Sequence, residues 1–258
     1  MSIRKREGIE RLIAALPTLS NYRLRVIEKV VSVFRAPIEF QRHESSMLIT
    51  PQVLQDFGDI LRLHHAFSRE PFSKDKFEYA LERVLVDSKV KAQLAPRGTR
   101  GYDIEITGER YSLKTEAAKA IKVESIHISK FMELGGGQWG ADPNDLVGLR
   151  EQFLTNLRGL DRILTLRALK KGDPTYKYEL IEIPKELLVR AENGRLEMKT
   201  ESSQIPKPGY CYVDEDGKML FSLYFDGGGE RKLQIKGLRK DLCVVHGVWE
   251  FPPLKDMP

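Results

Sequence analysis

The chain has few cysteines and no long apolar run, and both absences limit the class of protein it can be. Only Cys211 and Cys243 occur among its 258 residues, which excludes a disulfide framework and a cysteine-based zinc site. No apolar stretch is long enough to cross a membrane. The charged first ten residues are not followed by the apolar segment of a secretory signal. We therefore expect a cytoplasmic protein with no membrane partner.

The composition is that of a folded protein with a mild excess of positive charge. Hydrophobic residues make up 41% of the chain and charged residues 31%, which excludes a disordered chain. The net charge of +5 permits nucleic-acid binding but does not by itself indicate it. The length suits one large domain or two modest ones.

The first third of the chain is predicted to be helical. Apolar residues recur there at helical spacing, and Ser20 or Asn21, Thr50 and Ser73 are suited to cap helices. We predict a helical N-terminal region over residues 1–70 and a core over residues 71–258. The boundary is weakly marked, so a single domain is the alternative.

The remainder is predicted to be rich in strands. Alternating patterns predict strands over residues 102–106, 111–115, 126–131, 163–169, 176–183, 210–213, 219–225, 232–235 and 242–249. A predicted helix begins after Asn144 and leads into the strand at 163–169, which suggests a crossover in a mixed sheet. The predicted fold class is therefore α/β or α+β, with a mixed sheet flanked by helices.

One predicted hairpin, over residues 102–116, combines an aspartate and a lysine on its polar face. If Gly108 and Glu109 form a two-residue turn, Asp103 lies directly across from Lys114. Glu105, Ser112 and Glu116 share that face. Carboxylate and carbonyl oxygens are the ligands that Mg²⁺ prefers, and a nearby lysine can orient or deprotonate a water molecule. This face therefore suits metal-dependent hydrolysis of phosphodiesters.

The spacing from Asp103 to Lys114 resembles the PD-(D/E)xK signature of nucleases, although Ser112 occupies the position of its second acid. Three glutamates are possible substitutes. Glu116 shares a strand face with Lys114, Glu105 lies opposite Ser112 in the predicted register, and Glu78 borders the apolar stripe of the preceding helix. We favour Asp103 with Glu116 or Glu78, and the backbone carbonyl of Leu113 as a further ligand. A solvated Asp–Lys pair without a catalytic role is the alternative.

Longer segments of the chain strengthen this interpretation. Residues 112–119, 126–135, 180–185, 206–210, 221–228, 230–236 and 245–249, in this order, resemble the SmaI-like type II restriction endonucleases of the PD-(D/E)xK superfamily. The resemblance extends from about His64 to Trp249. It implies a homodimeric, Mg²⁺-dependent endonuclease that cuts double-stranded DNA at a palindromic GC-rich site such as CCCGGG, leaving blunt ends. By this resemblance Asp103, Lys114, Glu116 and Glu78 match family positions, whereas Glu105 does not.

Several basic residues are candidates for DNA contact. Guanine is read in the major groove mostly by Arg or Lys. Arg231, Lys232, Gln234 and Lys236 follow the glycines at 227–229 and are predicted to contact bases, with a solvated basic hairpin as the alternative. Phosphate contacts are predicted for Arg97, Arg100, Lys119 and Lys130, which flank the catalytic hairpin.

Two other functions remain compatible with the sequence. A DNA-repair or junction-resolving nuclease would use the same fold but would recognise DNA structure instead of sequence. A non-catalytic, sequence-specific DNA-binding protein would keep the fold without turnover, and the serine at position 112 is the feature that favours it.

Overall fold

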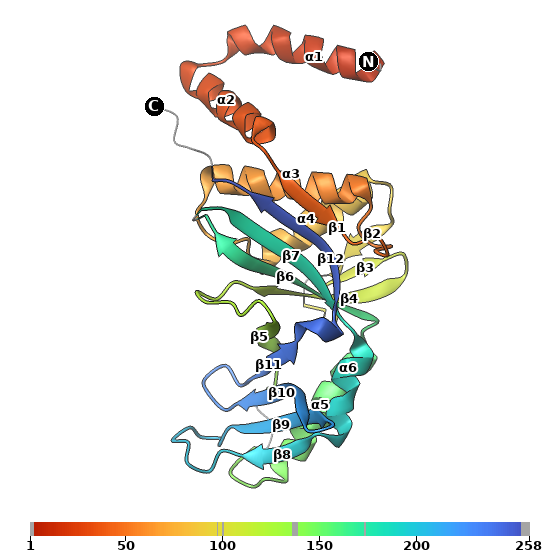
Figure 1. Cartoon of the computed structure of the whole chain (residues 1–258), viewed down its shortest axis with the longest axis vertical. Helices are drawn as coiled ribbons and strands as arrows, with labels where there is room; N and C mark the ends of the chain where they lie inside the picture. Colours follow the sequence, from red (N-terminus) through yellow and green to blue (C-terminus); the bar gives the residue numbers. More distant parts are fainter. Residues whose placement is uncertain (1–2, 97, 100, 136–138, 173, 254–258) are drawn as a thin grey trace.

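The protein contains two β-sheets and six α-helices in the part of the chain that the computed structural model describes, residues 3–96, 98–99, 101–135, 139–172 and 174–253 (Figure 1). The predicted α+β class is confirmed. The α-helices are α1 (Ile3–Ala15), α2 (Asn21–Arg35), α3 (Pro51–Phe67), α4 (Lys74–Asp87), α5 (Asp145–Arg158) and α6 (Lys185–Val189). Short 3-10 helices are η1 (Leu16–Thr18), η2 (Arg190–Asn193) and η3 (Lys240–Leu242).

The larger sheet has seven strands in the order β1-β12-β7-β6-β4-β3-β2. They are β1 (Glu39–Arg42), β2 (Ala92–Leu94), β3 (Ile104–Ile106), β4 (Glu109–Glu116), β6 (Arg162–Lys171), β7 (Tyr176–Ile183) and β12 (Val244–Phe251). Strands β4 and β6 are parallel, and α5 precedes β6 in the chain, so the predicted crossover in a mixed sheet is confirmed. Helices α3 and α4 cover one face of this sheet and enclose a core around Phe57, Phe77 and Trp249.

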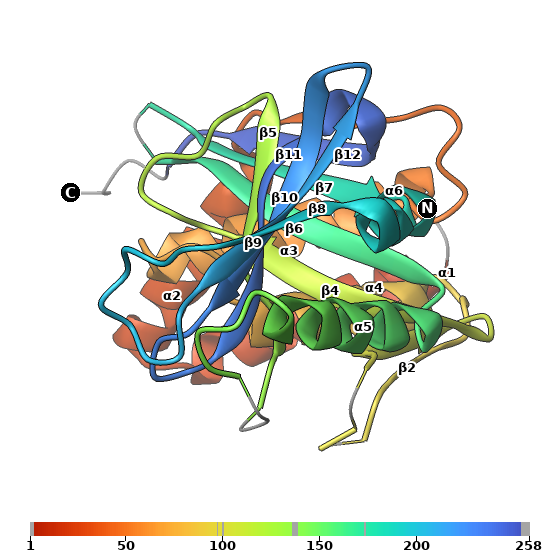
Figure 2. The same ribbon diagram turned by 90° about the horizontal axis from the view of Figure 1, so that it is seen from below.

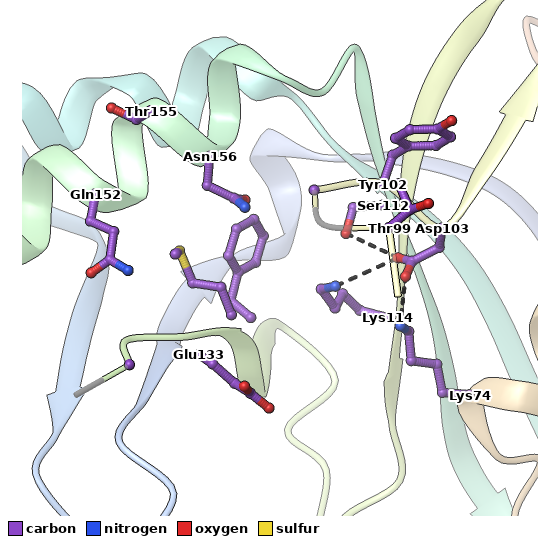
Figure 3. A pocket seen from close by; sticks show the side chains of 14 residues that line it. Lys74, Thr99, Tyr102, Asp103, Ser112, Lys114, Glu133, Gln152, Thr155 and Asn156 are labelled. Carbon is purple, nitrogen blue, oxygen red and sulfur yellow. Dashed lines mark hydrogen bonds and ion pairs between the residues drawn. The ribbon is translucent and has the colours of Figure 1, made fainter. Parts of the chain in front are cut away.

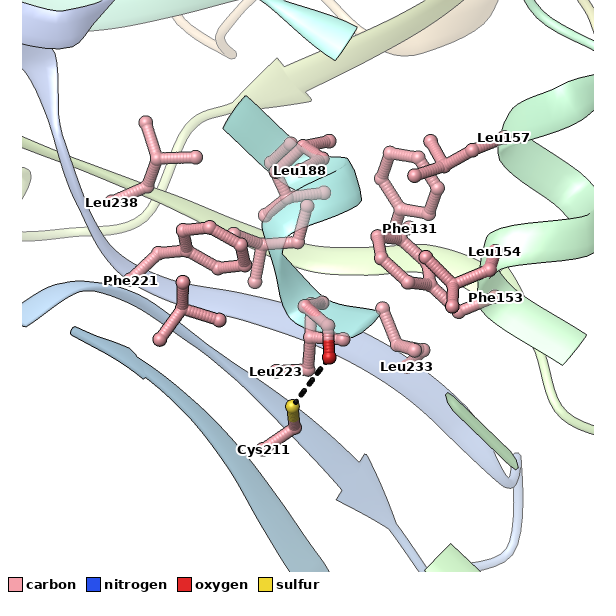
Figure 4. Packing of buried hydrophobic residues seen from close by; sticks show 14 of the residues in the cluster. Phe131, Phe153, Leu154, Leu157, Leu188, Cys211, Phe221, Leu223, Leu233 and Leu238 are labelled. Carbon is pink, nitrogen blue, oxygen red and sulfur yellow. Dashed lines mark hydrogen bonds between the residues drawn. The ribbon is translucent and has the colours of Figure 1, made fainter. Parts of the chain in front are cut away.

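The smaller sheet has five antiparallel strands in the order β5-β11-β10-β9-β8. They are β5 (Ser125–Glu133), β8 (Arg195–Met198), β9 (Gly209–Glu215), β10 (Lys218–Asp226) and β11 (Lys232–Arg239). Alternate side chains of the sheet pack with α5 and α6 in a second core that includes Phe153, Leu188 and Leu223 (Figure 4). Seen from below, this sheet lies in front of the larger one (Figure 2). The two sheets are therefore stacked along the long axis of the molecule.

Residues on both sides of position 70 contribute to the larger sheet and its core. Strand β1 pairs with β12, and the indole Nε1 of Trp249 donates a hydrogen bond to the carbonyl of Leu54 on α3 (2.8 Å). Gly58 allows this close packing, because a Cβ atom there would lie 2.2 Å from the ring of Phe40. Helices α1 and α2, in contrast, extend away from the two sheets (Figure 1). No helix in the described ranges is both long and apolar enough to cross a membrane.

Candidate active site

The hairpin of β3 and β4 turns one residue earlier than the sequence suggested. Thr107 and Gly108 occupy the turn with φ values of 52° and 93°, so Ile106 pairs with Glu109 and Ile104 with Tyr111. Two positive φ values are typical of a type I′ turn. The predicted turn at Gly108 and Glu109 is therefore wrong, and Asp103 lies beside Ser112 and not directly across from Lys114. The shift in pairing is two residues, which leaves Asp103 and Lys114 on the same face.

The side chain of Asp103 binds the backbone of β4 next to the end of β3. Asp103 immediately precedes β3, which begins at Ile104, and its carboxylate accepts a hydrogen bond from the backbone amide of Leu113 (2.6 Å). Ser112 Oγ lies 3.3 Å from the same carboxylate oxygen, Oδ2, and Lys114 Nζ lies 3.7 Å from it (Figure 3). In an extended strand the amide and carbonyl of one residue point to the same side. The carbonyl of Leu113 therefore points to the side of β4 on which Asp103 lies.

Burial and charge shift the ionisation of this pair in ways that suit catalysis. Burial lowers the pKa of the Lys114 ammonium to about 8, although Asp103 opposes the shift. Burial alone would raise the pKa of Asp103, but the charges of Lys114 and Lys74 outweigh it and the net pKa is lowered. Asp103 is thus held as a carboxylate beside a lysine that releases its proton more readily than usual.

A second lysine and a glutamate join this group from the start of α4. The ammonium of Lys74 lies 2.7 Å from Asp103 Oδ1 and 3.0 Å from Glu78 Oε1. Ser73 caps the helix by accepting a hydrogen bond from the amide of Lys76, which places Lys74 and Glu78 one turn apart on the same face. Glu78 is thus brought to Asp103 through Lys74. Lys74 was not predicted, although its spacing from Glu78 was visible in the sequence.

Glu116 lies elsewhere, in a buried charge network. Its carboxylate accepts hydrogen bonds from the amide of His127 (3.1 Å) and from the guanidinium of Arg167. Arg167 is fully buried and also binds Glu179. Burial raises the pKa of Glu116, and the contact with Arg167 opposes that shift. Among the described residues, no hydrogen bond or ion pair joins Glu116 to Asp103, Lys114 or Glu78. Glu105 pairs with Arg110 at the turn end of the hairpin.

Asp103, Lys114 and Lys74 line a cleft of about 580 Å³ between the hairpin, β5 and α5. Helix α5 forms the opposite wall with three polar side chains, Gln152, Thr155 and Asn156 (Figure 3). They lie on one face of the helix, because they are three and four residues apart, while Phe153 and Leu157 are buried in the core. Sequence reasoning predicted this helix but missed these three residues.

Some of the predicted DNA-binding residues lie at the rim of this cleft. Lys130 forms an ion pair with Glu133 (2.9 Å), a residue that lines the cleft. Lys232 pairs with Glu133 in the register of β5 and β11, and its ammonium binds Glu230 (2.9 Å). The backbone carbonyl of Arg231 accepts a hydrogen bond from the amide of Leu134 (2.7 Å). The loop between β10 and β11 therefore borders the cleft.

The other predicted DNA-binding residues are more distant or not described. The side-chain amide of Gln234 donates a hydrogen bond to Asp226 (3.0 Å). The ammonium of Lys236 lies 3.6 Å from the ring centre of Tyr224. Lys119 is exposed in the connection between β4 and β5. Arg97 and Arg100 lie outside the described residues.

The side chains around Asp103 fit a hard divalent cation. Asp103, Glu78 and the carbonyl of Leu113 offer only oxygen donors, which Mg²⁺ prefers to nitrogen or sulfur. No group of three or more His, Cys, Asp or Glu residues suited to a metal ion occurs in the described part of the chain. A two-carboxylate site completed by a carbonyl and water is consistent with the way that proteins bind Mg²⁺. The ammonium of Lys74 already places one positive charge between the two carboxylates.

A polar cleft with an ionised aspartate and a buried lysine on a mixed sheet is typical of an enzyme that cleaves phosphodiesters. Residues 12–251 match the model of the SmaI family, described as type II site-specific deoxyribonuclease, and the chain belongs to this family of DNA-cleaving enzymes. It is 49% identical over 201 residues to the type II restriction enzyme SmaI of Serratia marcescens, covering 76% of this chain and 79% of that enzyme. No solved structure gives a significant match. The predicted class, a type II restriction endonuclease, is confirmed.

Proposed function

We propose that the protein is a Mg²⁺-dependent endonuclease of the PD-(D/E)xK superfamily that cleaves double-stranded DNA at a short palindromic GC-rich site. We expect the protein to act in the cytoplasm, to recognise CCCGGG and to leave blunt ends. The main support is the position of Asp103, whose carboxylate is held by the Leu113 amide beside Lys114 in an open cleft.

Asp103, Glu78 and the carbonyl of Leu113 are the residues that would hold the metal. Bound Mg²⁺ would polarise the phosphoryl group and acidify the attacking water. Glu78 is favoured as the second carboxylate, because it shares a counter-ion with Asp103, while Glu116 is engaged by Arg167. We assign Glu116 to the support of β4 in place of its predicted catalytic and metal-binding role.

Lys114 acts on the attacking water. Its ammonium lies on the same face as the Asp103 carboxylate, and its lowered pKa lets it lose a proton and then accept one from the water. The water oxygen forms a bond to phosphorus as the bond to the 3′ oxygen breaks, in an in-line displacement. The leaving 3′ oxygen takes a proton from a solvent water in the open cleft, so the products are a 5′-phosphate and a 3′-hydroxyl. The protonated lysine then stabilises the charge on the phosphate.

The basic residues at the rim would bind the duplex. Lys130, Arg231 and Lys232 lie where the cleft opens, and are proposed to contact phosphates or guanine edges there. Lys119, Arg97 and Arg100 remain proposals for phosphate contacts, and Gln234 remains a proposal for a base contact.

A palindromic target implies a homodimer with two-fold symmetry. Helices α1 and α2 are the candidate interface, because they extend from the body (Figure 1) and because they expose apolar side chains. The exposed fractions are 52% for Leu12, 61% for Ile13 and 49% for Phe34.

A plasmid digest with Mg²⁺, followed by sequencing of the ends, tests this function. We expect discrete fragments with one end sequence from the natural protein. Lys114→Ala should lower the cleavage rate by at least about 10³-fold, because both proton transfer and charge stabilisation are lost, while binding of the same duplex in EDTA persists. Lys76→Ala, an exposed lysine on α4, is the control.

The outcomes of these experiments distinguish this function from the alternatives. Unchanged cleavage by Lys114→Ala would falsify the catalytic assignment. Cleavage only at junctions or mismatches would indicate a repair nuclease. Tight binding of one sequence without any cleavage would indicate a non-catalytic DNA-binding protein.

A further inference from the structure

The ammonium of Lys74 is held between two carboxylates that come from different elements. It lies 2.7 Å from Asp103 Oδ1, next to β3, and 3.0 Å from Glu78 Oε1, on α4. In the described part of the chain, Lys74 is the only polar partner of Asp103 Oδ1 and the only ion-pair partner of Glu78. The other carboxylate oxygen, Oδ2, is bound by the Leu113 amide and faces Lys114.

Asp103 Oδ1 and the Glu78 carboxylate are therefore the side-chain groups that a metal ion could take, and Lys74 now binds both. Both carboxylates are largely shielded, with side chains 19% and 20% exposed. Two shielded carboxylates in one site repel each other unless a cation lies between them. Lys74 supplies that cation from a side chain that is itself 40% exposed and lines the cleft. The Lys74 side chain can therefore move away from the two carboxylates without disturbing the core.

We propose that Lys74 is a built-in counter-ion, which occupies the divalent cation's position in the metal-free enzyme and is displaced when the metal binds. This inference rests on the proposed metal site. Binding is then an exchange of one cation for another. Only the molecules in which Lys74 has moved away from the two carboxylates can bind the metal, so the apparent metal affinity falls in proportion to their fraction. Removal of the ammonium should accordingly strengthen metal binding.

Titration of the DNA-free protein with Mn²⁺ or Mg²⁺ in a calorimeter tests the exchange. Lys74→Met should bind the metal about tenfold more tightly, because a competing charge a few ångströms from both carboxylates has been removed. Lys76→Met is the matched control, since it lies in the same first turns of α4, is exposed, and forms no ion pair in the described ranges. Its metal affinity should equal that of the natural protein.

Thermal unfolding provides a second readout that does not depend on cleavage. Without metal, Lys74→Met should unfold at a lower temperature than Lys76→Met, because Glu78 then lacks its counter-ion and Asp103 keeps only Lys114. Saturating Mg²⁺ should then raise its unfolding temperature by more than it raises that of the natural protein. Lys74→Gln, which keeps a hydrogen-bond donor without the charge, serves if the methionine variant does not fold.

Asp103→Asn distinguishes failure of this inference from failure of the metal site itself. If Asp103→Asn abolishes metal binding but Lys74→Met and Lys74→Gln bind metal no more tightly than the natural protein, Lys74 does not hold the cation's place and the inference is overturned. If the natural protein binds no metal, or Asp103→Asn binds it as well as the natural protein does, the proposed site is wrong and the exchange falls with it.

Discussion

At the scale of single residues, the motif in the sequence lacks its second acid, and the fold brings one candidate, Glu78, to Asp103 through Lys74. Ser112 occupies the position of the second carboxylate, but its hydroxyl contacts Asp103 and cannot replace a charged ligand. Glu78 reaches the same group from a helix that precedes the hairpin by many residues. Sequence reasoning named both Glu78 and Glu116, but could not choose between them, because the partner that engages Glu116 is Arg167, on a strand distant in sequence.

Substitution of each glutamate by glutamine separates the two roles. Glu78→Gln should weaken Mg²⁺ binding by about tenfold or more, with little loss of stability, because Lys74 is its only ion-pair partner among the described residues and is partly exposed. Glu116→Gln should lower the free energy of unfolding by about 3 kcal/mol, because it leaves the buried guanidinium of Arg167 with one charged partner fewer. Metal titration and urea unfolding measure the two effects. The opposite pattern would place Glu116 in the metal site.

At the scale of secondary structure, the sequence predicted elements that carry a strong local signal. The side chains of Ser20, Thr50 and Ser73 cap α2, α3 and α4 as expected, and β7 spans the predicted residues. The short elements β1, β2, β8 and α6 were missed, because three to five residues show no recognisable period. The turn of the β3–β4 hairpin was misplaced, because Thr107 adopts a positive φ of 52°, which is uncommon for a residue other than glycine.

Helix α5 gives a prediction about DNA recognition. We expect Gln152→Ala and Asn156→Ala each to weaken binding of the specific duplex by about tenfold, because both amides face the cleft and can hydrogen-bond to bases or phosphates. Gln52→Ala, a polar substitution on an exposed position of α3, is the control and should bind normally. Fluorescence anisotropy in EDTA measures the affinities. Normal binding by both α5 variants would remove this helix from the interface.

Strand β12 is held at its end by a carboxylate that titrates in acid. Glu250 is bound by Lys170 (2.7 Å), Lys177 (2.8 Å) and Thr175 (2.9 Å), and these contacts lower its pKa to about 2. A lowered folded pKa contributes stability above the unfolded pKa and loses it as the pH falls through the folded value.

Glu250→Gln should therefore cost about 1 kcal/mol of unfolding free energy at neutral pH, a modest value because both lysines are partly exposed. The difference from the natural protein should shrink as the pH falls from about 4.5 toward 2. Urea unfolding over this pH range measures it. Glu44→Gln, at an exposed glutamate without an ion pair in the described chain, should show no such trend.

At the scale of the whole molecule, a buried charge network joins the two sheets and so fixes the cleft between them. Arg167 on β6 binds the last residue of β4, Glu116, and the carbonyls of Lys122 (2.7 Å) and Ser125 (2.8 Å), where the chain crosses to the smaller sheet. Glu179 links Arg167 to Lys240, where the chain crosses back. The sequence predicted most of these strands but not their division between two sheets, because that depends on contacts between distant residues.

The last prediction concerns assembly and the helices α1 and α2, which together we call the arm of each subunit. If they hold two subunits together, the double substitution Leu12→Asp and Ile13→Asp should convert the dimer to a monomer, because it puts charge into an apolar interface. Sedimentation in an analytical ultracentrifuge measures the change. A monomer carries one catalytic cleft, so cleavage of both strands at one site should slow much more than nicking of a single strand.

A control must show that the position of the charge matters, and not merely its introduction. Val86→Asp changes an apolar side chain on α4 that is 48% exposed, close to the exposure of Leu12, but it lies on the body of the protein and not on the arm. This variant should remain dimeric and cleave both strands. If the arm variant is also dimeric, the subunits meet elsewhere. If the natural protein is itself a monomer that cuts both strands together, two-fold symmetry is not the basis of its recognition of a palindrome.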